Sequence, residues 1–319
     1  MEGLQQAVEK IRQSKTIAIS CHINPDGDCL GSLLALGLGL ERLGKTVHML
    51  SPGGVPKSYR QLPGAGRVTN KFSGRADLAI AVDCNAKEML GRMYRAFERA
   101  GDILEIDHHE FRRSFGSASL LDSKAAAVGE IIYILLKRLR LKITKDIAEN
   151  ILTSIIVETN SFRLPMVRPL TFTVCAQLMK TGLDFHKLSE LIYWSKTEAA
   201  ARMLGVCLSR SRLFHNGRII WSMALKKDLK RFKAREEDVD SAANELLSVK
   251  GVEAAVFFRE QGKRLLRVSL RSKGKINVAS IAEEYKGGGH FDAAGCLIPN
   301  HKNARDQLLN LIRERIRNR

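Results

Sequence analysis

The chain of 319 residues has few of the features that mark membrane, secreted or disulfide-bonded proteins. Its longest apolar run, Leu33 to Leu40, is interrupted by two glycines and is too short to span a bilayer. The first residues lack the basic and apolar regions of a signal peptide. The six cysteines form no CxxC pair, which argues against a disulfide framework or a cysteine zinc site. We therefore expect a cytoplasmic protein with reduced thiols and no membrane partner.

Aromatic and acidic residues are also scarce. Aromatic side chains make up 6% of the chain, so a long stacking platform for single strands is not evident. The 34 Asp and Glu are outnumbered by 52 Lys and Arg, which gives a formal net charge of +18. Such an excess does not determine a fold, but it favours anionic partners such as nucleic acids or phosphorylated ligands. The excess is denser in the last hundred residues, which favours a basic cleft for short, phosphate-rich substrates over duplex binding.

In the first half of the chain, short apolar runs alternate with helical patterns, which predicts βαβ units and a parallel sheet. The strands are expected at Thr16–His22, Thr46–Leu50, Ala76–Asp83 and Asp102–Asp107. A nearly all-helical stretch follows, up to about Phe214, and then a second alternation of strands and helices. The sequence therefore predicts an α/β protein. Residues 1–195 form a doubly wound, mostly parallel domain, residues 196–216 a helical connector, and residues 217–319 a smaller α/β domain.

Acidic and histidine side chains follow three of these expected strands, and one more closes a helix. They are His22, Asp26 and Asp28, then Asp83, then Asp107, His108 and His109, and finally Glu158. Ligands bind at the carboxyl ends of parallel strands, so these groups are expected to meet there. Carboxylates together with imidazoles are suitable ligands for Mn²⁺. So many of these ligands are enough for two ions, which could cleave a phosphodiester by the two-metal route. A single Asp at the end of a strand often serves only as the N-cap of the next helix. For Asp28, a cap on the helix that opens at Gly31 is the rival explanation.

A second candidate site lies near the end of the chain. The segment Gly287, Gly288, Gly289 and His290 follows an expected helix, and Lys286 precedes it. Glycines expose backbone N–H groups and let an anion approach closely, and a histidine donates hydrogen bonds to phosphate. Arg271 and Ser272, at the end of the preceding strand, are the expected phosphate partners. These six residues, Arg271, Ser272 and Gly287 to His290, are the predicted substrate-binding set.

In this order and together, the motifs resemble those of the DHH phosphoesterase superfamily. The arrangement with a DHH-associated C-terminal domain resembles the branch of oligoribonucleases and PAP phosphatases, over nearly the whole chain. The resemblance implies that His22 and Asp26 hold one Mn²⁺, and that Asp28 and His108 hold another. It implies that Asp83 bridges the two ions together with a nucleophilic water, and that Mg²⁺ or Co²⁺ could substitute.

The resemblance also implies roles for the neighbours of His108. Asp107 would orient His108, because a metal-bound histidine needs a partner for its other nitrogen. His109 would lie near the substrate phosphate as a hydrogen-bond donor or proton shuttle. One segment departs from the family pattern, which reads Asp-Thr-Gly where this chain has Glu158, Thr159 and Asn160. Glu158 can still be a metal ligand, and Asn160 tolerates a left-handed conformation better than most residues.

The implied function is hydrolysis of short oligoribonucleotides to mononucleotides, and of 3′-phosphoadenosine 5′-phosphate (PAP) to AMP, by a homodimer. Two alternatives lie within the superfamily: a phosphodiesterase for pApA or cyclic di-AMP, and a single-strand DNA exonuclease. An alternative from another class is a catalytically silent nucleic-acid-binding protein, which Glu158 and the charge excess would both fit.

Overall fold

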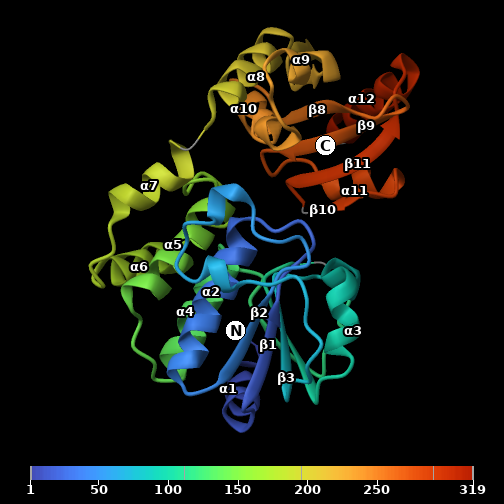
Figure 1. The fold of residues 1–319 in the computed structure, drawn as a ribbon. Helices are drawn as coiled ribbons and strands as arrows, with labels where there is room; N and C mark the ends of the chain where they lie inside the picture. Colours follow the sequence, from blue (N-terminus) through green and yellow to red (C-terminus); the bar gives the residue numbers. More distant parts are fainter. Residues whose placement is uncertain (1, 111, 195, 290, 318–319) are drawn as a thin grey trace. The chain divides into compact units, whose positions relative to one another are not determined.

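The computed structural model describes residues 2–110, 112–194, 196–289 and 291–317 (Figure 1). The chain divides into two compact units, residues 1–195 and 196–319. Each unit has its own sheet, with apolar clusters on both of its faces.

The first unit is built on five parallel strands in the order β2-β1-β3-β4-β5. They are β1 (Thr16–Ser20), β2 (Thr46–Leu50), β3 (Leu78–Val82), β4 (Asp102–Asp107) and β5 (Ala118–Leu121). The predicted α/β class with a parallel N-terminal sheet is therefore confirmed. The edge strand β5 was not predicted from the sequence, because its four residues are too few to show a pattern.

The two faces of this sheet carry side chains of different size. Ile17 and Ile19 of β1 belong to the large core with α1 (Leu4–Gln13), α2 (Gly27–Arg42), α4 (Val128–Arg138) and α5 (Lys145–Glu158). Ala18, between them, points to the opposite face and packs with Phe97 of α3 (Tyr94–Phe97). Figure 1 shows α2 and α4 on one side of the strands and α3 on the other. Because successive side chains of a strand point to opposite faces, the bulky side chains lie on one face of the sheet and the small ones on the other.

Helices α2 and α5 pack unusually closely, and two glycines allow it. A Cβ atom on Gly27 would lie 2.6 Å from the side chain of Val157, and one on Gly31 would lie 2.4 Å from the carbonyl oxygen of Asn150. Any larger residue would push the helices apart. The close contact brings the start of α2 next to the end of α5. Helices α6 (Pro169–Met179) and α7 (Phe185–Tyr193) complete the unit.

The second unit has a mixed sheet in the order β10-β11-β9-β8-β7-β6, in which β7 and β8 pair in parallel and the other pairs are antiparallel. Its strands are β6 (Arg212–Phe214), β7 (Ile219–Ala224), β8 (Ala254–Gln261), β9 (Leu265–Ser272), β10 (Gly288–Gly289) and β11 (Ala293–Pro299). Its helices are α8 (Glu198–Ser209), α9 (Lys226–Arg231), α10 (Ala242–Leu247), α11 (Val278–Glu284) and α12 (Lys302–Arg317). Short 3₁₀ turns lie at Lys57–Tyr59, Ala65–Arg67, Lys87–Met93 and Glu236–Val239.

Two stretches of this unit have a helical sequence pattern that is longer than the helix in the structure. The pattern from Thr197 to Phe214 reads as one helix, but α8 ends at Ser209 and β6 follows as an edge strand on β7. Met203 and Cys207 of α8 are buried with residues of that sheet. The stretch 236–249 likewise splits into a 3₁₀ turn and α10. Apolar spacing alone does not distinguish a short edge strand from one more helical turn.

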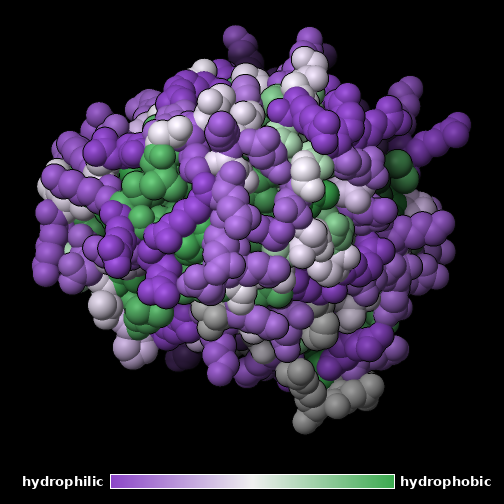
Figure 2. Space-filling model, turned by 90° about the horizontal axis from the view of Figure 1, so that it is seen from below, coloured by the Kyte–Doolittle hydropathy of each residue, from purple (hydrophilic) through white to green (hydrophobic). Residues whose placement is uncertain are grey.

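Hydrophilic side chains cover most of the face seen in Figure 2, with hydrophobic ones in separate groups between them. Among the described residues, no helix has both the length and the apolar character needed to cross a membrane.

A partly buried ion pair fixes the start of α9 and gives a first prediction. Asp228 accepts hydrogen bonds from Arg210 Nη1 and Nη2 at 2.5 and 3.2 Å, and from the backbone N–H of Leu225 at 3.0 Å. The Arg210 guanidinium lowers the pKa of Asp228, and burial opposes this only in part. We expect Asp228→Asn to lower the free energy of unfolding at pH 7 by about 1–3 kcal/mol, measured by urea denaturation.

The sign of its pH dependence follows from the lowered pKa. The carboxylate stabilises the fold above its unfolded pKa, about 3.9, and this contribution is lost as the pH falls through the lower folded pKa. The stability gap between wild type and Asp228→Asn therefore narrows below pH 4. A gap of constant size from pH 7 to pH 3 would contradict the ionic origin of the effect.

Candidate metal centre

The loop after β1 places the first three candidate residues. Asp26 is the N-cap of α2, and its Oδ1 accepts hydrogen bonds from the backbone N–H groups of Asp28 and Cys29, both at 3.1 Å. His22 Nε2 lies 3.9 Å from the same Oδ1 atom. The cap on this helix is therefore Asp26, and the suggestion that Asp28 caps it is wrong.

Asp28 instead points into the closely packed helices and is fully buried. Its Oδ1 accepts hydrogen bonds from Ser154 Oγ of α5 at 2.6 Å and from Ser32 Oγ at 3.2 Å. Its Oδ2 accepts one from the backbone N–H of Val128, at the start of α4, at 3.1 Å. One carboxylate therefore joins three helices, and its position is fixed by all of them.

Asp83 follows β3 directly and has a left-handed backbone conformation, with φ 58°. Such a conformation costs an ordinary residue roughly 1–2 kcal/mol, and Asp tolerates it better than most. The backbone N–H of Asp83 donates to Ile106 O at 3.0 Å, which holds the turn. The carboxylate lies among three imidazoles: Oδ2 is 3.6 Å from His22 Nε2, and Oδ1 is 3.9 Å from His108 Nε2 and 3.7 Å from His109 Nδ1.

The two histidines after β4 have different partners. His108 Nδ1 lies 3.1 Å from the carbonyl oxygen of Ala125, which can only accept, so Nδ1 carries a proton. In the neutral ring, Nε2 is therefore the nitrogen whose lone pair can bind a cation. Asp107 Oδ1 contacts His109 Nδ1 at 2.5 Å and accepts from the backbone N–H groups of both histidines. The expectation that Asp107 orients the His108 ring is therefore wrong, because Ala125 does so and Asp107 holds His109.

The potential donor atoms fall into three groups whose members lie within 4.8 Å of one another. The groups are His22, Asp26, Cys29 and Asp83; then Asp83, His108 and His109; and finally Asp28, His108 and Glu158. Asp83 and His108 each belong to two groups. Two buried donor atoms, Asp83 Oδ1 and His108 Nε2, have no hydrogen-bond partner in the described part of the chain. Buried polar atoms are rarely left unpaired, so the residues present fit a pair of divalent cations.

The electrostatics of the groups support the same interpretation. Burial would lower the pKa of His22, but Asp83 and Asp26 outweigh it and raise the pKa to about 10. Asp28 and Glu158 outweigh burial in the same way and raise the pKa of His108 to about 10. Burial, together with neighbouring carboxylates, raises the pKa of Asp28 to about 7. In the cation-free chain protons therefore compensate the acidic cluster, and divalent cations would replace them.

Glu158 closes α5, and its Oε1 lies 3.7 Å from His108 Nε2. Behind it, the backbone makes a left-handed turn of three residues, with φ 46° at Asn160, 64° at Ser161 and 62° at Phe162. Asn160 thus occupies the conformation expected of it in place of glycine. Arg163 donates to the carbonyl oxygen of Asn160 at 2.7 Å and to its side-chain oxygen at 2.6 Å.

This turn gives a second prediction. A β-branched residue is poorly tolerated at positive φ, so Asn160→Val is expected to lower the free energy of unfolding by about 1–2 kcal/mol. Asn160→Gly relieves the backbone but loses a surface hydrogen bond, so a change below about 0.5 kcal/mol is expected. Urea unfolding of both variants measures the difference. Equal stabilities of the Val and Gly variants would show that the turn carries no strain.

The predicted substrate residues of the second unit have structural partners of their own. Cβ atoms on Gly287 and Gly289 would lie 2.2 Å from Gly295 O and 2.4 Å from Ala293 O, so both glycines are needed for the pairing of β10 with β11. Gly288 is exposed, with open space where a side chain would be. His290 lies outside the described residues.

The two strand-end residues of this set are also engaged. Arg271 Nε donates to Asn244 Oδ1 at 2.8 Å. Ser272 is buried, and its hydroxyl donates to Ile276 O at 2.7 Å, which closes a turn. In this structure Ser272 is thus a turn contact and not an exposed anion ligand.

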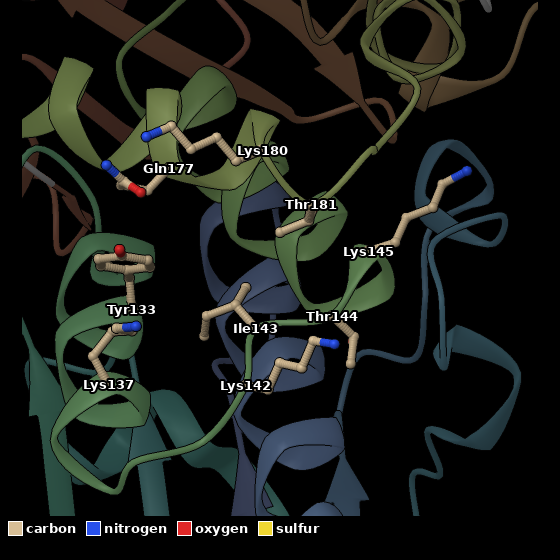
Figure 3. A pocket seen from close by; sticks show the side chains of 9 residues that line it. All are labelled: Tyr133, Lys137, Lys142, Ile143, Thr144, Lys145, Gln177, Lys180 and Thr181. Atoms are coloured by element: carbon tan, nitrogen blue, oxygen red, sulfur yellow. The ribbon is translucent and has the colours of Figure 1, made fainter.

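One cavity, of about 550 Å³, lies away from the acidic cluster. It is lined by Tyr133 and Lys137 of α4, by the loop before α5 with Lys142, and by the end of α6 with Lys180 (Figure 3). Glu158 ends α5 at the opposite end from this cavity. At 1.5 Å per residue, the 14-residue helix separates the two by about 20 Å. Screening over such a distance is strong, so we assign the cavity no part in the chemistry.

Several residues that shape the centre were not predicted. Arg112, little exposed, pairs with buried Glu105 and lies 3.6 Å from Asp107 Oδ2. Ser154 lies four residues before Glu158 on α5, and this spacing on one helix face was a usable signal. For Arg112, one of two adjacent arginines in a polar stretch, only burial distinguishes the inward side chain.

Two family models match the chain. Residues 16–156 match the DHH family N-terminal domain, and residues 218–318 match the DHHA1 domain. Together the matched segments cover the five parallel strands and most of the mixed sheet.

Known proteins are similar over most of the chain. A bifunctional oligoribonuclease and PAP phosphatase NrnA from Thermus thermophilus is 28% identical over 305 residues, 94% of this chain and 90% of the relative. An exopolyphosphatase-related protein from Bacteroides fragilis has the same fold, with a TM-score of 0.91 at 23% identity over 98% of this chain and 95% of that one. RecJ from Thermus thermophilus, in complex with Mn²⁺, matches with a TM-score of 0.60 and 16% identity over all of this chain and 55% of its own.

Proposed function

We infer that this chain, which belongs to the DHH/DHHA1 phosphoesterases, hydrolyses short oligoribonucleotides to mononucleotides and converts PAP to AMP. The observation that carries the proposal is the cluster of donor atoms around Asp83, with the unpaired atoms Asp83 Oδ1 and His108 Nε2 inside it. Full-length similarity to an oligoribonuclease and PAP phosphatase supports the substrate class. The glycine loop at Gly287–Gly289 and the excess of positive charge suit nucleotides.

We assign the metal centre to residues 1–195 and substrate binding to residues 217–319, with residues 196–216 connecting them. His22 and Asp26 would hold one cation, Asp28, His108 and Glu158 would hold the other, and Asp83 would contribute to both positions. Mn²⁺ is the proposed ion, since carboxylates and imidazoles suit it and the RecJ relative carries it. When bound, such ions lower the pKa of a water molecule and neutralise the charge of a phosphodiester.

The chain's own residues prepare this chemistry. Asp28 stays in place because Ser154 and Val128 hold both of its oxygens. His109 holds its Nδ1 proton against Asp107, so its other ring nitrogen can donate to a substrate phosphate or move a proton to the leaving group. Burial lowers the pKa of His109, but Asp107 outweighs this and raises it, which favours the protonated donor form.

In the second unit, we propose that the backbone of Gly287 and Gly288, together with His290 and Arg271, contacts the substrate phosphate or base. Gly288 is exposed on the edge strand of its sheet, so no side chain hinders the approach of an anion to the backbone there. We also propose that the active form is a homodimer, which sedimentation equilibrium would test.

A substrate panel tests the function. The metal-stripped full-length protein is incubated with labelled di- to pentaribonucleotides, PAP, pApA, cyclic di-AMP and single-stranded DNA, each with Mn²⁺, Mg²⁺ or EDTA. The proposal expects Mn²⁺-dependent release of mononucleotides from the short RNAs and of AMP from PAP, with the other substrates at least about tenfold slower. Faster turnover of cyclic di-AMP or DNA would replace the substrate assignment. Binding of oligonucleotides without hydrolysis of any substrate would support the silent binding protein instead.

A further inference from the structure

A short segment between β5 and α4 contacts two of the proposed metal ligands through its backbone alone. We call residues 122–130 the bracing segment. Its Ala125 carbonyl oxygen lies 3.1 Å from His108 Nδ1, and its Val128 N–H donates to Asp28 Oδ2 at 3.1 Å. Both ligands belong to the same group of donors. The bracing segment therefore sets two donor positions of one cation site.

One arginine outside the bracing segment holds both of its ends. Arg168, the N-cap of α6, donates from Nη2 to Asp122 Oδ2 at 2.9 Å and to Glu130 Oε2 at 3.1 Å. Asp122 is the first residue of the segment, and Glu130, in the first turn of α4, is the last. Glu130 is fully buried, and its other oxygen has no hydrogen-bond partner among the described residues. Because a buried carboxylate without a counter-charge is costly, the ion pair with Arg168 fixes Glu130 in place.

Contacts within the bracing segment carry this restraint to its backbone. The N–H of Ala125 donates to Asp122 O at 2.9 Å, and the N–H of Glu130 donates to Ala127 O at 3.1 Å. Both alanines are buried, and their methyl side chains offer no polar anchor of their own. The positions of the two backbone groups that contact metal ligands therefore depend on the separation of the two ends, which Arg168 fixes.

The other cation position has no such connection. His22 and Asp26 lie on the loop after β1, and in the described part of the chain no hydrogen bond joins either of them to residues 122–130. Asp26 instead accepts from the backbone N–H groups of Asp28 and Cys29. Loss of the arginine should thus disturb one cation position and spare the other.

We propose that Arg168 is a positioning residue for the cation position of Asp28, His108 and Glu158, because it holds both ends of the segment that orients two of these ligands. Arg168 contacts none of the three and acts through the bracing segment. The inference rests on the two-cation centre of the proposed function and adds to it a difference in how the two positions are supported. Loss of an outer contact of this kind commonly lowers metal affinity by about 10–100-fold.

The experiment titrates the metal-stripped full-length protein with Mn²⁺, without substrate, and measures the free ion by electron paramagnetic resonance. We expect the wild type to bind two ions per chain. In Arg168→Gln one ion binds within about threefold of its wild-type affinity, and the other binds at least about tenfold more weakly. Arg168→Lys, which keeps a positive charge beside buried Glu130, shows the same split with a smaller loss.

Two histidine variants assign the weakened position. His22→Ala leaves only the position supported by the bracing segment, and in this background Arg168→Gln lowers the remaining Mn²⁺ affinity at least about tenfold. His108→Ala leaves only the other position, and there the same change has an effect below about threefold. Arg210→Gln breaks an ion pair of similar exposure in the second unit, so it is the matched control and leaves both affinities within about threefold.

Far-UV circular dichroism and urea unfolding of the cation-free variants check that each one folds, and Arg168→Lys serves if Arg168→Gln does not. A general loosening of the fold would weaken both positions. Equal weakening of both, of neither, or of the His22 position alone in a folded variant would overturn the proposal. A wild type that binds fewer than two ions would overturn it together with the two-cation centre. Selective weakening of the expected position without hydrolysis of any substrate would support it and contradict the proposed function alone.

Discussion

Asp83→Asn is expected to lower kcat/KM for the preferred short substrate by at least about a thousandfold, equivalent to about 4 kcal/mol of transition-state stabilisation. The carboxylate of Asp83 lies between His22, His108 and His109. Asp83 belongs to two of the three donor groups, and the third contains His108, which it contacts. An amide has nearly the same shape, but it lacks the negative charge that a bridge between two cations needs. Metal analysis of the purified variant should show fewer than two tightly bound ions per chain.

Asn is a better replacement for Asp83 than most other residues because the backbone at this position is left-handed. Asn tolerates this conformation as well as Asp does, so the fold should be kept, and thermal unfolding of the cation-free forms would verify it. Lys137→Gln, in the cavity at the other end of the helices, is the control and should stay within twofold of wild type. A rate for Asp83→Asn within tenfold of wild type would contradict the two-cation assignment.

Asp107→Asn is expected to lower kcat by about 10²–10³-fold while the affinity for Mn²⁺ changes less than threefold. The fully buried carboxylate holds the His109 ring, whereas His108 is oriented by Ala125. Loss of the charge weakens the hold on protonated His109, so the limb of the pH–rate profile that requires this form moves to lower pH. Steady-state kinetics from pH 5 to 10, together with Mn²⁺ titration, measure both effects.

The split between rate and metal affinity distinguishes the two roles considered for Asp107. If it oriented His108, the Mn²⁺ affinity would fall together with kcat, and the pH profile would keep its position at saturating metal. Asp146→Asn, an exposed change of the same kind at the start of α5, is the matched control and should leave both quantities unchanged. A large loss of Mn²⁺ affinity in Asp107→Asn would contradict the contact with His109 as the source of the effect.

Sequence patterns could predict where the site lies because they depend on a simple rule of parallel sheets. Asp83 and Asp107 each follow a buried apolar run, and the carboxyl ends of such strands meet. What could not be predicted depends on which way a side chain turns within one or two residues. Asp26 and Asp28 have the same chemistry, and only the backbone of the turn decides that the first caps α2 and the second is buried between helices.

The residues that support the metal-binding side chains could not be predicted from the sequence for a related reason. Ala125 contributes a carbonyl oxygen, which every residue has, and Arg112 is one of many arginines until burial sets it apart. Cys29 appears in the sequence as an ordinary core thiol, and its burial agrees with that interpretation.

The anchoring of Asp28 to α2, α4 and α5 has a thermodynamic consequence. A cation bound at this carboxylate is bound to three helices of one core at once, and the unfolded chain offers no equivalent position. Binding energy therefore adds directly to the stability of the first unit, by about 2.7 kcal/mol at a free cation concentration one hundred times the dissociation constant. The cell's supply of divalent cations would then regulate how long the protein survives as well as how fast it works, and chains starved of cations would be the first to unfold and be degraded.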